Sequence, residues 1–139
     1  MNYDNIPSRF EVMVKKVYYV YEKFGLDFSF ALLSLAKPIS VTDLSQYVRS
    51  SDVLIPIDEN HYFIIFQFTS PDAAFRTSQE LVFSLDKFFN QPKSSFVAIE
   101  KLNINITPLN VLKRLDSIVQ ATKKAGYSQV ETEDILDNE

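Results

Sequence analysis

The sequence predicts one domain of mixed α/β (α+β) class, in which helices pack on a mainly antiparallel, ferredoxin-like sheet and a further helix comes first. Two apolar segments flank the polar turn at residues 58–60, a pattern that is typical of a β-hairpin. A strand–helix–strand pattern occurs on each side of the hairpin, which favours a single sheet. The 139 residues are 46% hydrophobic, which suits one compact core.

The N-terminal helix is predicted over residues 9–24, within a helical segment that spans 8–25. Ser8 followed by Glu11 is a capping box, and Gly25 is suited to a left-handed helix end. Apolar residues recur between these signals at helical spacing: Phe10, Val14, Val17, Tyr21 and Phe24.

The other faces of this helix are also rich in apolar residues, among them Tyr18 and Tyr19. A single contact with the core would leave much of that surface in water. Two interpretations follow. The helix is wedged deeply in its own domain, or it is a dimerisation or relay helix in which Tyr18 and Tyr19 contact a partner.

Strands and a short helix follow. Residues 26–37 are apolar almost throughout, which is typical of a central strand. The next segment has room for only a short helix, predicted to begin at Thr42 and to present Leu44, Tyr47 and Val48. Pro56 cannot donate a ladder hydrogen bond, so strand 53–57 is predicted at a sheet edge, whereas residues 61–69 are typical of an interior strand.

A long helix is predicted after the hairpin. Ser70 precedes Pro71 at the first helical position, and the helix should end near Asn90. One face of this helix carries its buried side chains: Ala74, Phe75, Ser78, Leu81, Val82, Leu85, Phe88 and Phe89.

The C-terminal part repeats this order of elements. A strand is predicted within residues 94–104, and Thr107 with Pro108 begins a last helix that ends before Gly126. The inward face of that helix is expected to carry Leu109, Leu112, Leu115, Ile118 or Val119, and Thr122. A short strand within 127–131 and an acidic tail, residues 133–139, complete the chain.

Composition excludes several classes of function. Without cysteine there is no disulfide, thiolate metal site or cysteine nucleophile, and His61 is the only histidine. The net charge of -4 and the absence of a long basic run argue against a nucleic-acid partner. The two glycines, Gly25 and Gly126, both suit helix ends, which leaves none for a phosphate-binding loop. No cofactor is expected.

The chain has no export signal and no apolar segment of membrane length. A cytoplasmic location without direct membrane insertion is therefore predicted. The chain could also be a domain taken from a larger membrane-bound parent.

The stretch LDSIVQATKKAGYSQV, residues 115–130, resembles the C-terminal signature of GGDEF domains, the diguanylate cyclases. Asp116, Lys123, Gly126 and Val130 match residues of that signature at the same spacing.

Upstream features carry the same resemblance. RSSD at residues 49–52 resembles the RxxD motif of the family. Five residues separate it from the segment that stands where the five-residue family motif would be: Asp58, Glu59, Asn60, His61 and Tyr62. The start of the helix at Ser70 is also similar to the family, so the resemblance covers about residues 26–132. It implies a single degenerate domain with a nucleotide-cyclase-like fold.

The turn departs from what catalysis in this family requires. The resemblance implies that two glycines let the backbone approach the nucleotide, while acidic side chains hold the metal ions that bridge the GTP phosphates. Asp58 and Glu59 stand in place of the glycines. Asn60 and His61 stand in place of the acidic residues. We therefore expect no metal site and no catalytic residue.

Other positions depart from the family in the same way. The aspartates of its first strand would fall near Ser34 and Ala36, which cannot replace them as metal ligands. The segment before RxxD is about one helix too short, which removes the FK motif and the residues that read the guanine. Tyr127 replaces a phosphate-binding arginine, and only Lys123 remains. A lone lysine at a helix end is typically a solvated charge.

A different metal site formed by His61 with Asp58 and Glu59 is a further hypothesis. A general base at His61 would need an oriented partner and an enclosed pocket. Three polar residues at a hairpin tip are also what a solvent-exposed turn contains, and this interpretation is favoured.

Arg49 and Asp52 are the candidate ligand-binding residues. In the family that the sequence resembles, this pair forms the inhibitory site for cyclic di-GMP. Arginine can grip a phosphate or guanine edge, and a carboxylate can accept from guanine N–H groups. The alternative is structural, with Arg49 near a helix C-terminus and Asp52 at the start of a turn.

Three functional hypotheses result. The first is a catalytically inactive GGDEF-like signalling module that contacts a second copy of itself or a signalling protein. The second is a cyclic di-GMP receptor that uses Arg49 and Asp52. The third, residual activity on a nucleotide, is least favoured.

Overall fold

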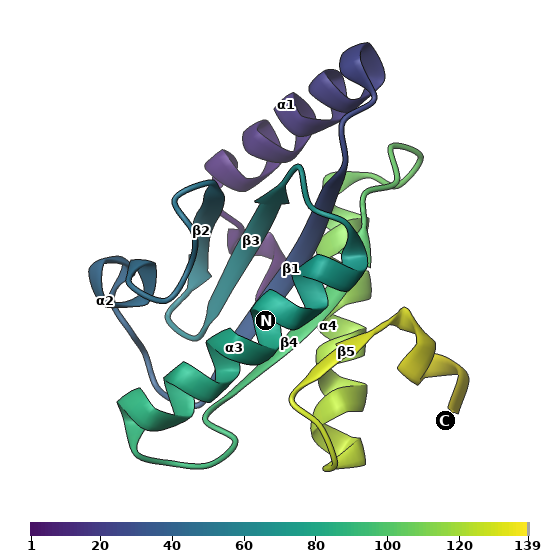
Figure 1. The fold of residues 1–139 in the computed structure, drawn as a ribbon. Coiled ribbons are helices and arrows are strands. Elements are labelled where there is room, and N and C mark those ends of the chain that lie inside the picture. The colour runs from purple at the N-terminus through teal and green to yellow at the C-terminus, as the bar shows by residue number, and fades with distance from the viewer. Residues whose placement is uncertain (139) are drawn as a thin grey trace.

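The computed structural model describes residues 1–138 of the chain (Figure 1). It contains a five-stranded sheet in the order β2-β3-β1-β4-β5. The strands are β1 (Phe28–Leu35), β2 (Asp52–Asp58), β3 (His61–Gln67), β4 (Ser95–Lys101) and β5 (Val130–Thr132). Every pairing is antiparallel except that of β4 with β5. This mixed, mainly antiparallel sheet with a preceding helix confirms the predicted fold class.

Helices cover both faces of the sheet. They are α1 (Ser8–Phe24), α2 (Val41–Ser45), α3 (Pro71–Phe89) and α4 (Pro108–Ala125), with short 3₁₀ helices η1 (Tyr3–Asn5) and η2 (Glu133–Asn138). Figure 1 shows α3 in front of the sheet and α4 behind it. The buried side chains of α1 and α4 share one hydrophobic cluster, whereas those of α2 and α3 share another. Among residues 1–138, no helix has the length and apolar character needed to cross a membrane.

The central strand β1 explains why the sequence there is almost uniformly apolar. All eight of its residues are buried, because both of its faces are covered. Phe28, Phe30 and Leu32 face the α1–α4 cluster. The intervening residues Ala31, Leu33 and Leu35 face the α3 cluster, as the alternation of side chains along a strand requires.

The β2–β3 hairpin places its tip beside the end of β1. Strand β2 lies at the sheet edge and β3 lies inside, as Pro56 and the apolar run after it predicted. His61 is paired with Ser34 across β3 and β1. Asn60 fixes the turn through two bonds to Leu35, because its carbonyl accepts from the Leu35 amide at 2.8 Å and its side-chain amide donates to the Leu35 carbonyl at 3.0 Å.

Two predicted helix caps were wrong. The N-cap of α1 is Pro7, and Ser8 lies inside the helix with no capping bond, so the capping box does not form. Pro7, with φ of -59° and ψ of 138°, directly precedes the helix, which begins one residue earlier than the box requires. Helix α2 begins at Val41 rather than Thr42, because the Ser40 hydroxyl caps it by accepting from the Asp43 amide at 3.1 Å.

The signals for the other helix ends are confirmed, whereas Phe88 and Leu109, which were expected on buried faces of their helices, are exposed. Ser70 and Thr107 cap α3 and α4, and each helix has proline in its first turn. Helix α1 ends at Gly25 with φ of 64° and α4 ends at Gly126 with φ of 74°, left-handed conformations that favour glycine.

The C-terminal segment is more than an acidic tail. Residues Glu133–Asn138 form η2, and Ile135 is buried in the cluster of α1 and α4. A single apolar side chain among acidic ones was too weak a signal to predict this packing. Strand β5 also begins later than expected, at Val130.

Candidate functional site

Side chains at the hairpin tip bond to one another. Oδ1 of Asp58 accepts a hydrogen bond from the Asn60 backbone amide at 2.8 Å, which closes the turn. The same oxygen lies 2.8 Å from Nδ1 of His61. Glu59, between them, is exposed. The turn is therefore built by Asp58, which links two of the other motif positions.

The chain of contacts continues from the turn into the sheet. Nε2 of His61 lies 3.4 Å from the Ser34 hydroxyl. Nζ of Lys123, at the end of α4, donates to the same hydroxyl at 3.0 Å. Ser34 is buried, and the Lys123 ammonium also lies 5.8 Å from the centre of the Phe96 ring. The network thus joins Asp58, His61, Ser34 and Lys123.

This network adds a contact to the expectation for Lys123. The residue is exposed in the last turn of α4, as a solvated charge at a helix end would be, and its ammonium also donates to Ser34, 89 residues away in sequence. The strand position of Ser34 and the signature position of Lys123 were both recognisable. Their contact depends on how α4 lies against β1, which neither segment specifies alone.

Tyr62 has a different role from the rest of the motif. Its side chain is buried with the residues that face α3, and its hydroxyl donates to the Ile39 carbonyl at 2.7 Å. Burial raises the pKa of this phenol. Tyr62 therefore holds the segment before α2 against the sheet and lies on the opposite face from Ser34.

Metal-binding groups do not converge in the part of the chain that the structure describes. Within residues 1–138 no three side chains of histidine, aspartate or glutamate are arranged to hold an ion. At the turn, the imidazole of His61 and one carboxylate oxygen of Asp58 are engaged with each other.

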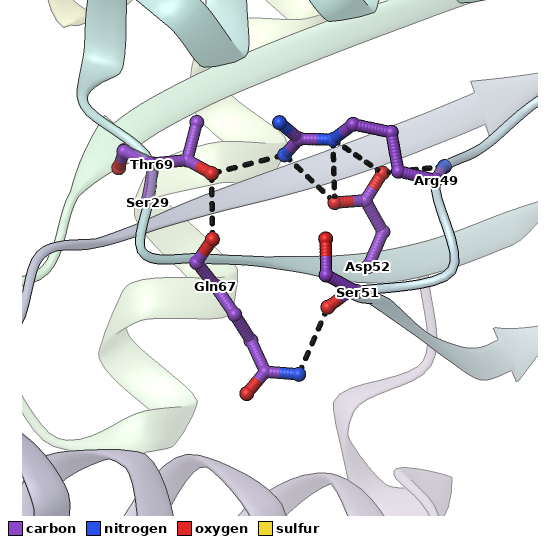
Figure 2. Close-up of polar contacts among 6 residues, drawn as sticks. All are labelled: Ser29, Arg49, Ser51, Asp52, Gln67 and Thr69. Carbon is purple, nitrogen blue, oxygen red and sulfur yellow. Dashed lines mark hydrogen bonds and ion pairs between the residues drawn. The ribbon is translucent and has the colours of Figure 1, made fainter.

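Arg49 and Asp52 form a tight pair at the start of β2 (Figure 2). Nη2 of Arg49 donates to Oδ1 of Asp52 at 2.8 Å, and Nε donates to the same oxygen at 3.1 Å. The Arg49 backbone amide donates to Oδ2 at 2.9 Å. The Asp52 side chain is 0% exposed and that of Arg49 is 42% exposed. The buried Asp52 side chain thus holds Arg49 from the protein interior, and part of the Arg49 side chain stays accessible to solvent.

The segment between β3 and α3 completes this cluster. Nη2 of Arg49 also donates to the Thr69 hydroxyl at 2.9 Å, and that hydroxyl donates to the Gln67 carbonyl at 2.7 Å. The Ser29 hydroxyl donates to the Thr69 carbonyl at 2.9 Å. Figure 2 shows the guanidinium between Asp52 and Thr69. The planar arginine head is thereby held in one orientation, which suits recognition of a phosphate or a base edge.

The structure separates this pair from a helix terminus. Helix α2 ends at Ser45, and the guanidinium bonds to Asp52 and Thr69. The helix-dipole interpretation of Arg49 was therefore wrong, although Asp52 does close a turn, since its amide donates to the Arg49 carbonyl at 3.0 Å.

The hairpin tip and the arginine cluster are separate sites. Asp52 is at the first residue of β2 and Asp58 at the last, so six residues of strand place them about 20 Å apart. A ligand group bound at one of these sites therefore does not contact the other.

Tyr18 and Tyr19, the candidate interaction residues of α1, point in different directions. The Tyr18 hydroxyl donates to the Ile106 carbonyl at 2.7 Å, and its ring lies 6.2 Å from that of Phe30. Tyr19 is 63% exposed. Tyr18 therefore packs within its own domain, and only Tyr19 is available to a partner.

Comparison with known proteins bears on the fold. No protein-family model and no curated protein sequence matches the chain. Solved structures do match. The GGDEF domain of DgcB from Caulobacter crescentus, in complex with c-di-GMP, aligns with a TM-score of 0.71 and 11% identity, covering 89% of this chain and 85% of that one.

Two structures from Pseudomonas aeruginosa are also similar. The GGDEF domain of YfiN (TpbB) gives a TM-score of 0.68 at 11% identity, over 91% of this chain and 96% of that one. The diguanylate cyclase SiaD, in complex with its activator SiaC, gives 0.74 at 12% identity, over 91% of this chain and 58% of that one. At these identities the comparisons show a GGDEF-like fold.

Proposed function

We propose that this chain is a catalytically inactive GGDEF-like module that acts in signalling through contacts with other protein chains. One observation carries the proposal: the polar side chains at the hairpin tip bond to one another, from Asp58 through His61 and Ser34 to Lys123. The metal ions that accompany a nucleoside triphosphate need free carboxylates as ligands at such a turn.

The chemistry of the network supports the same proposal. The ammonium group of Lys123 donates to the buried Ser34 hydroxyl at the end of β1. This positive charge would repel a metal ion at the same place. Asn60 is bound to the backbone of Leu35 through both its carbonyl and its side chain. The turn is therefore a closed structural unit.

Product analysis tests the loss of catalysis. The purified domain would be incubated with each nucleoside triphosphate and magnesium or manganese, and the products would be separated by chromatography beside an active diguanylate cyclase. We expect no cyclic or linear dinucleotide. Product that disappears in an Asp58→Asn variant would refute the proposal.

The outer surface of α1 supports protein contacts. Val12 and Tyr19 are exposed and lie seven residues apart, on one face of the helix, while Phe10, Val14 and Val17 pack inward. Apolar side chains gathered on one exposed face are typical of an interaction site.

Light scattering coupled to size-exclusion chromatography tests this surface. We expect the wild type to self-associate as concentration rises and Tyr19→Glu to reduce the association. Tyr127→Glu is the matched control, because Tyr127 is equally exposed but lies beyond α4. A wild type that stays monomeric would remove self-association and leave a different protein as partner.

A second candidate function is reception of cyclic di-GMP. It is favoured by the orientation of Arg49, which Asp52 and Thr69 hold while part of the guanidinium stays accessible. The two carboxylate oxygens of Asp52 already accept from Arg49, so we assign ligand contact to the arginine and its positioning to the aspartate.

Calorimetry separates the two candidates. The domain would be titrated with cyclic di-GMP, with GTP plus magnesium as the ligand control. Receptor function requires saturable binding that Arg49→Ala abolishes and Arg49→Lys weakens, since lysine lacks the planar fork. Arg76→Ala, at an exposed arginine on α3, is the matched control and should bind as the wild type does. No binding by the wild type would reject reception.

A further inference from the structure

We propose that the outer edge of β5 and the groove beside it bind an extended segment of another protein, one in which apolar and basic side chains alternate. Strand β5 is the last strand of the sheet and pairs with β4 (Figure 1). It lies at the opposite edge from β2, so the site is separate from the Arg49 cluster and from the hairpin tip. The site also does not include α1, so it goes beyond the self-association proposed there.

The backbone of β5 offers hydrogen-bonding groups on its outer side. The amide of Val97 in β4 donates to the Gln129 carbonyl at 2.7 Å, and Val97 is paired with Val130. Because the bonding groups of a strand alternate between its two sides, Glu131 bonds toward β4, whereas the amides of Val130 and Thr132 point away from it. No strand within residues 1–138 lies on that side. Such an edge is a template for a further strand.

A groove lies between this edge and α3. Its volume is about 340 Å³, and residues 128–131 form one of its walls. The other wall is one face of α3, with side chains at helical spacing: Phe75, Gln79, Val82, Phe83 and Asp86.

The groove suits the apolar side chains of an added strand. The Val130 side chain is buried in the cluster that faces α3, and alternate side chains of a strand beside it would face the same way. They would meet Phe83, which is 62% exposed. Main-chain bonds at a sheet edge, combined with a hollow for alternate side chains, are the means by which proteins recognise extended peptides.

The charges at this edge favour basic side chains in the partner. Asp86 and Glu131 line the groove, and neither forms an ion pair in the part of the chain that the structure describes. Asp86 accepts from neutral groups, the amide and hydroxyl of Ser94 at 2.9 and 2.8 Å and the Gln129 side chain at 3.3 Å. Glu131 accepts from the Ser128 hydroxyl at 2.7 Å. Lysine or arginine side chains would complement these two negative charges.

The same charges argue against a second copy of this chain as the occupant. Pairing of two β5 strands would bring Glu131 of each copy close to the other, together with Glu133 and Asp134, which follow directly. Like charges that face each other across a strand pair are destabilising. The occupant is therefore a segment of a different protein.

Nuclear magnetic resonance on the whole chain tests the proposal with the peptide acetyl-Lys-Val-Lys-Val-Lys-amide. The control peptide, acetyl-Val-Lys-Lys-Lys-Val-amide, has the same composition and charge without the alternation. We expect saturable shifts at the amides of Val130 and Thr132 with the first peptide and clearly weaker binding of the second. Hydrogen exchange of these two amides should slow, because the added strand bonds to them.

Three outcomes would overturn the proposal: no saturable binding, equal binding of the two peptides, or unchanged exchange at Val130 and Thr132. Slow exchange at these amides in the concentrated protein alone, lost on dilution, would assign the edge to a second copy and would also overturn it.

Substitutions assign the binding to the groove. Phe83→Ser removes an exposed ring and should weaken binding of the alternating peptide about tenfold. Glu131→Gln should weaken it several-fold, because one complementary charge is lost. Phe24→Ser is the matched control, since Phe24 is also 62% exposed but ends α1, and it should bind as the wild type does. Equal binding by Phe83→Ser and the wild type would contradict the assignment to the groove and overturn the proposal.

Discussion

At the residue scale, the buried Asp52 side chain fixes the orientation of the partly exposed Arg49 guanidinium. Its carboxylate accepts from the backbone amide and the guanidinium of Arg49, and the side chain is wholly buried. In the proposed cyclic di-GMP site, ligand contact therefore falls to the arginine, and the aspartate holds it in place.

Loss of this carboxylate should destabilise the fold. We expect Asp52→Ala to lower the free energy of unfolding by about 1–3 kcal/mol, because several charge-assisted hydrogen bonds are lost at once. Urea denaturation measures the change. Asp27→Ala, at an exposed aspartate, is the control and should have little effect. Equal stability of Asp52→Ala and the wild type would mean that the pair contributes nothing.

Glu133 should make stability depend on pH. Its pKa is raised above the ordinary value of 4.5, first by burial and then by Glu100. Because the folded state holds the proton more tightly, the stability contributed by this group is complete below pH 4.5 and is lost as the pH rises through the raised pKa.

The comparison with Glu133→Gln isolates this effect. We expect the stability of the wild type relative to the variant to fall as the pH rises from 4.5, because glutamine does not titrate. Chemical denaturation of both proteins across this range gives the difference. A difference that is constant with pH, or that grows with it, would contradict the raised pKa.

At the scale of elements, the caps show which local signals decide where helices begin. Ser8 and Ser70 both precede an apolar helical pattern, yet only Ser70 has a hydroxyl that accepts from a helix amide, that of Ala73 at 3.3 Å. Because Pro7 is the N-cap of α1, Ser8 is the first residue inside the helix and does not stand at the cap position.

The two serines should therefore respond differently to substitution. Ser70→Ala should lower the free energy of unfolding by about 1 kcal/mol, which is typical for loss of an N-cap. Ser8→Ala should change it by less than roughly 0.5 kcal/mol. Thermal and urea unfolding of the pair provide the measurement. Equal losses in the two variants would restore the capping box at Ser8.

At the scale of the whole molecule, both ends of the chain close onto α4. The Tyr3 hydroxyl donates to Asp116 at 2.6 Å near the N-terminus, and Glu133 binds Arg114 near the C-terminus. Ile135 enters the cluster of α1 and α4. Ile135 of η2 thus completes the hydrophobic cluster between the sheet and the helices α1 and α4.

Removal of the Ile135 side chain should weaken the whole domain. We expect Ile135→Ala to lower the free energy of unfolding by about 2 kcal/mol or more, since buried methyl groups are lost and a cavity remains. Leu136→Ala, next to it but exposed, should cost less than roughly 0.5 kcal/mol. Equal effects of the two would show that η2 does not stabilise the core.

The sequence predicted most elements because their signals are local. The apolar run of β1, proline at the edge strand and the caps of α3 and α4 act within a few residues and were confirmed. The predicted start of α2 was wrong because two nearby residues, Ser40 and Thr42, can both cap a helix, and Ser40 does so.

The candidate sites were only partly predictable. Arg49 with Asp52 was proposed as a pair from its resemblance to the RxxD motif, and Asp58 with His61 from their shared place at the hairpin tip. Thr69, which completes the arginine cluster, was missed because its contact with Arg49 needs the segment after β3 to pass beside the start of β2.

By itself the sequence determined the class of fold, the edge position of β2 and the absence of any thiol or multi-histidine chemistry, because these follow from residue type and local order. Tertiary structure alone decided that Lys123 reaches Ser34, that Tyr18 turns inward, and that Glu100 meets Glu133 at a cavity. Such contacts join segments far apart in the chain, and only the packing of helices on the sheet sets their geometry.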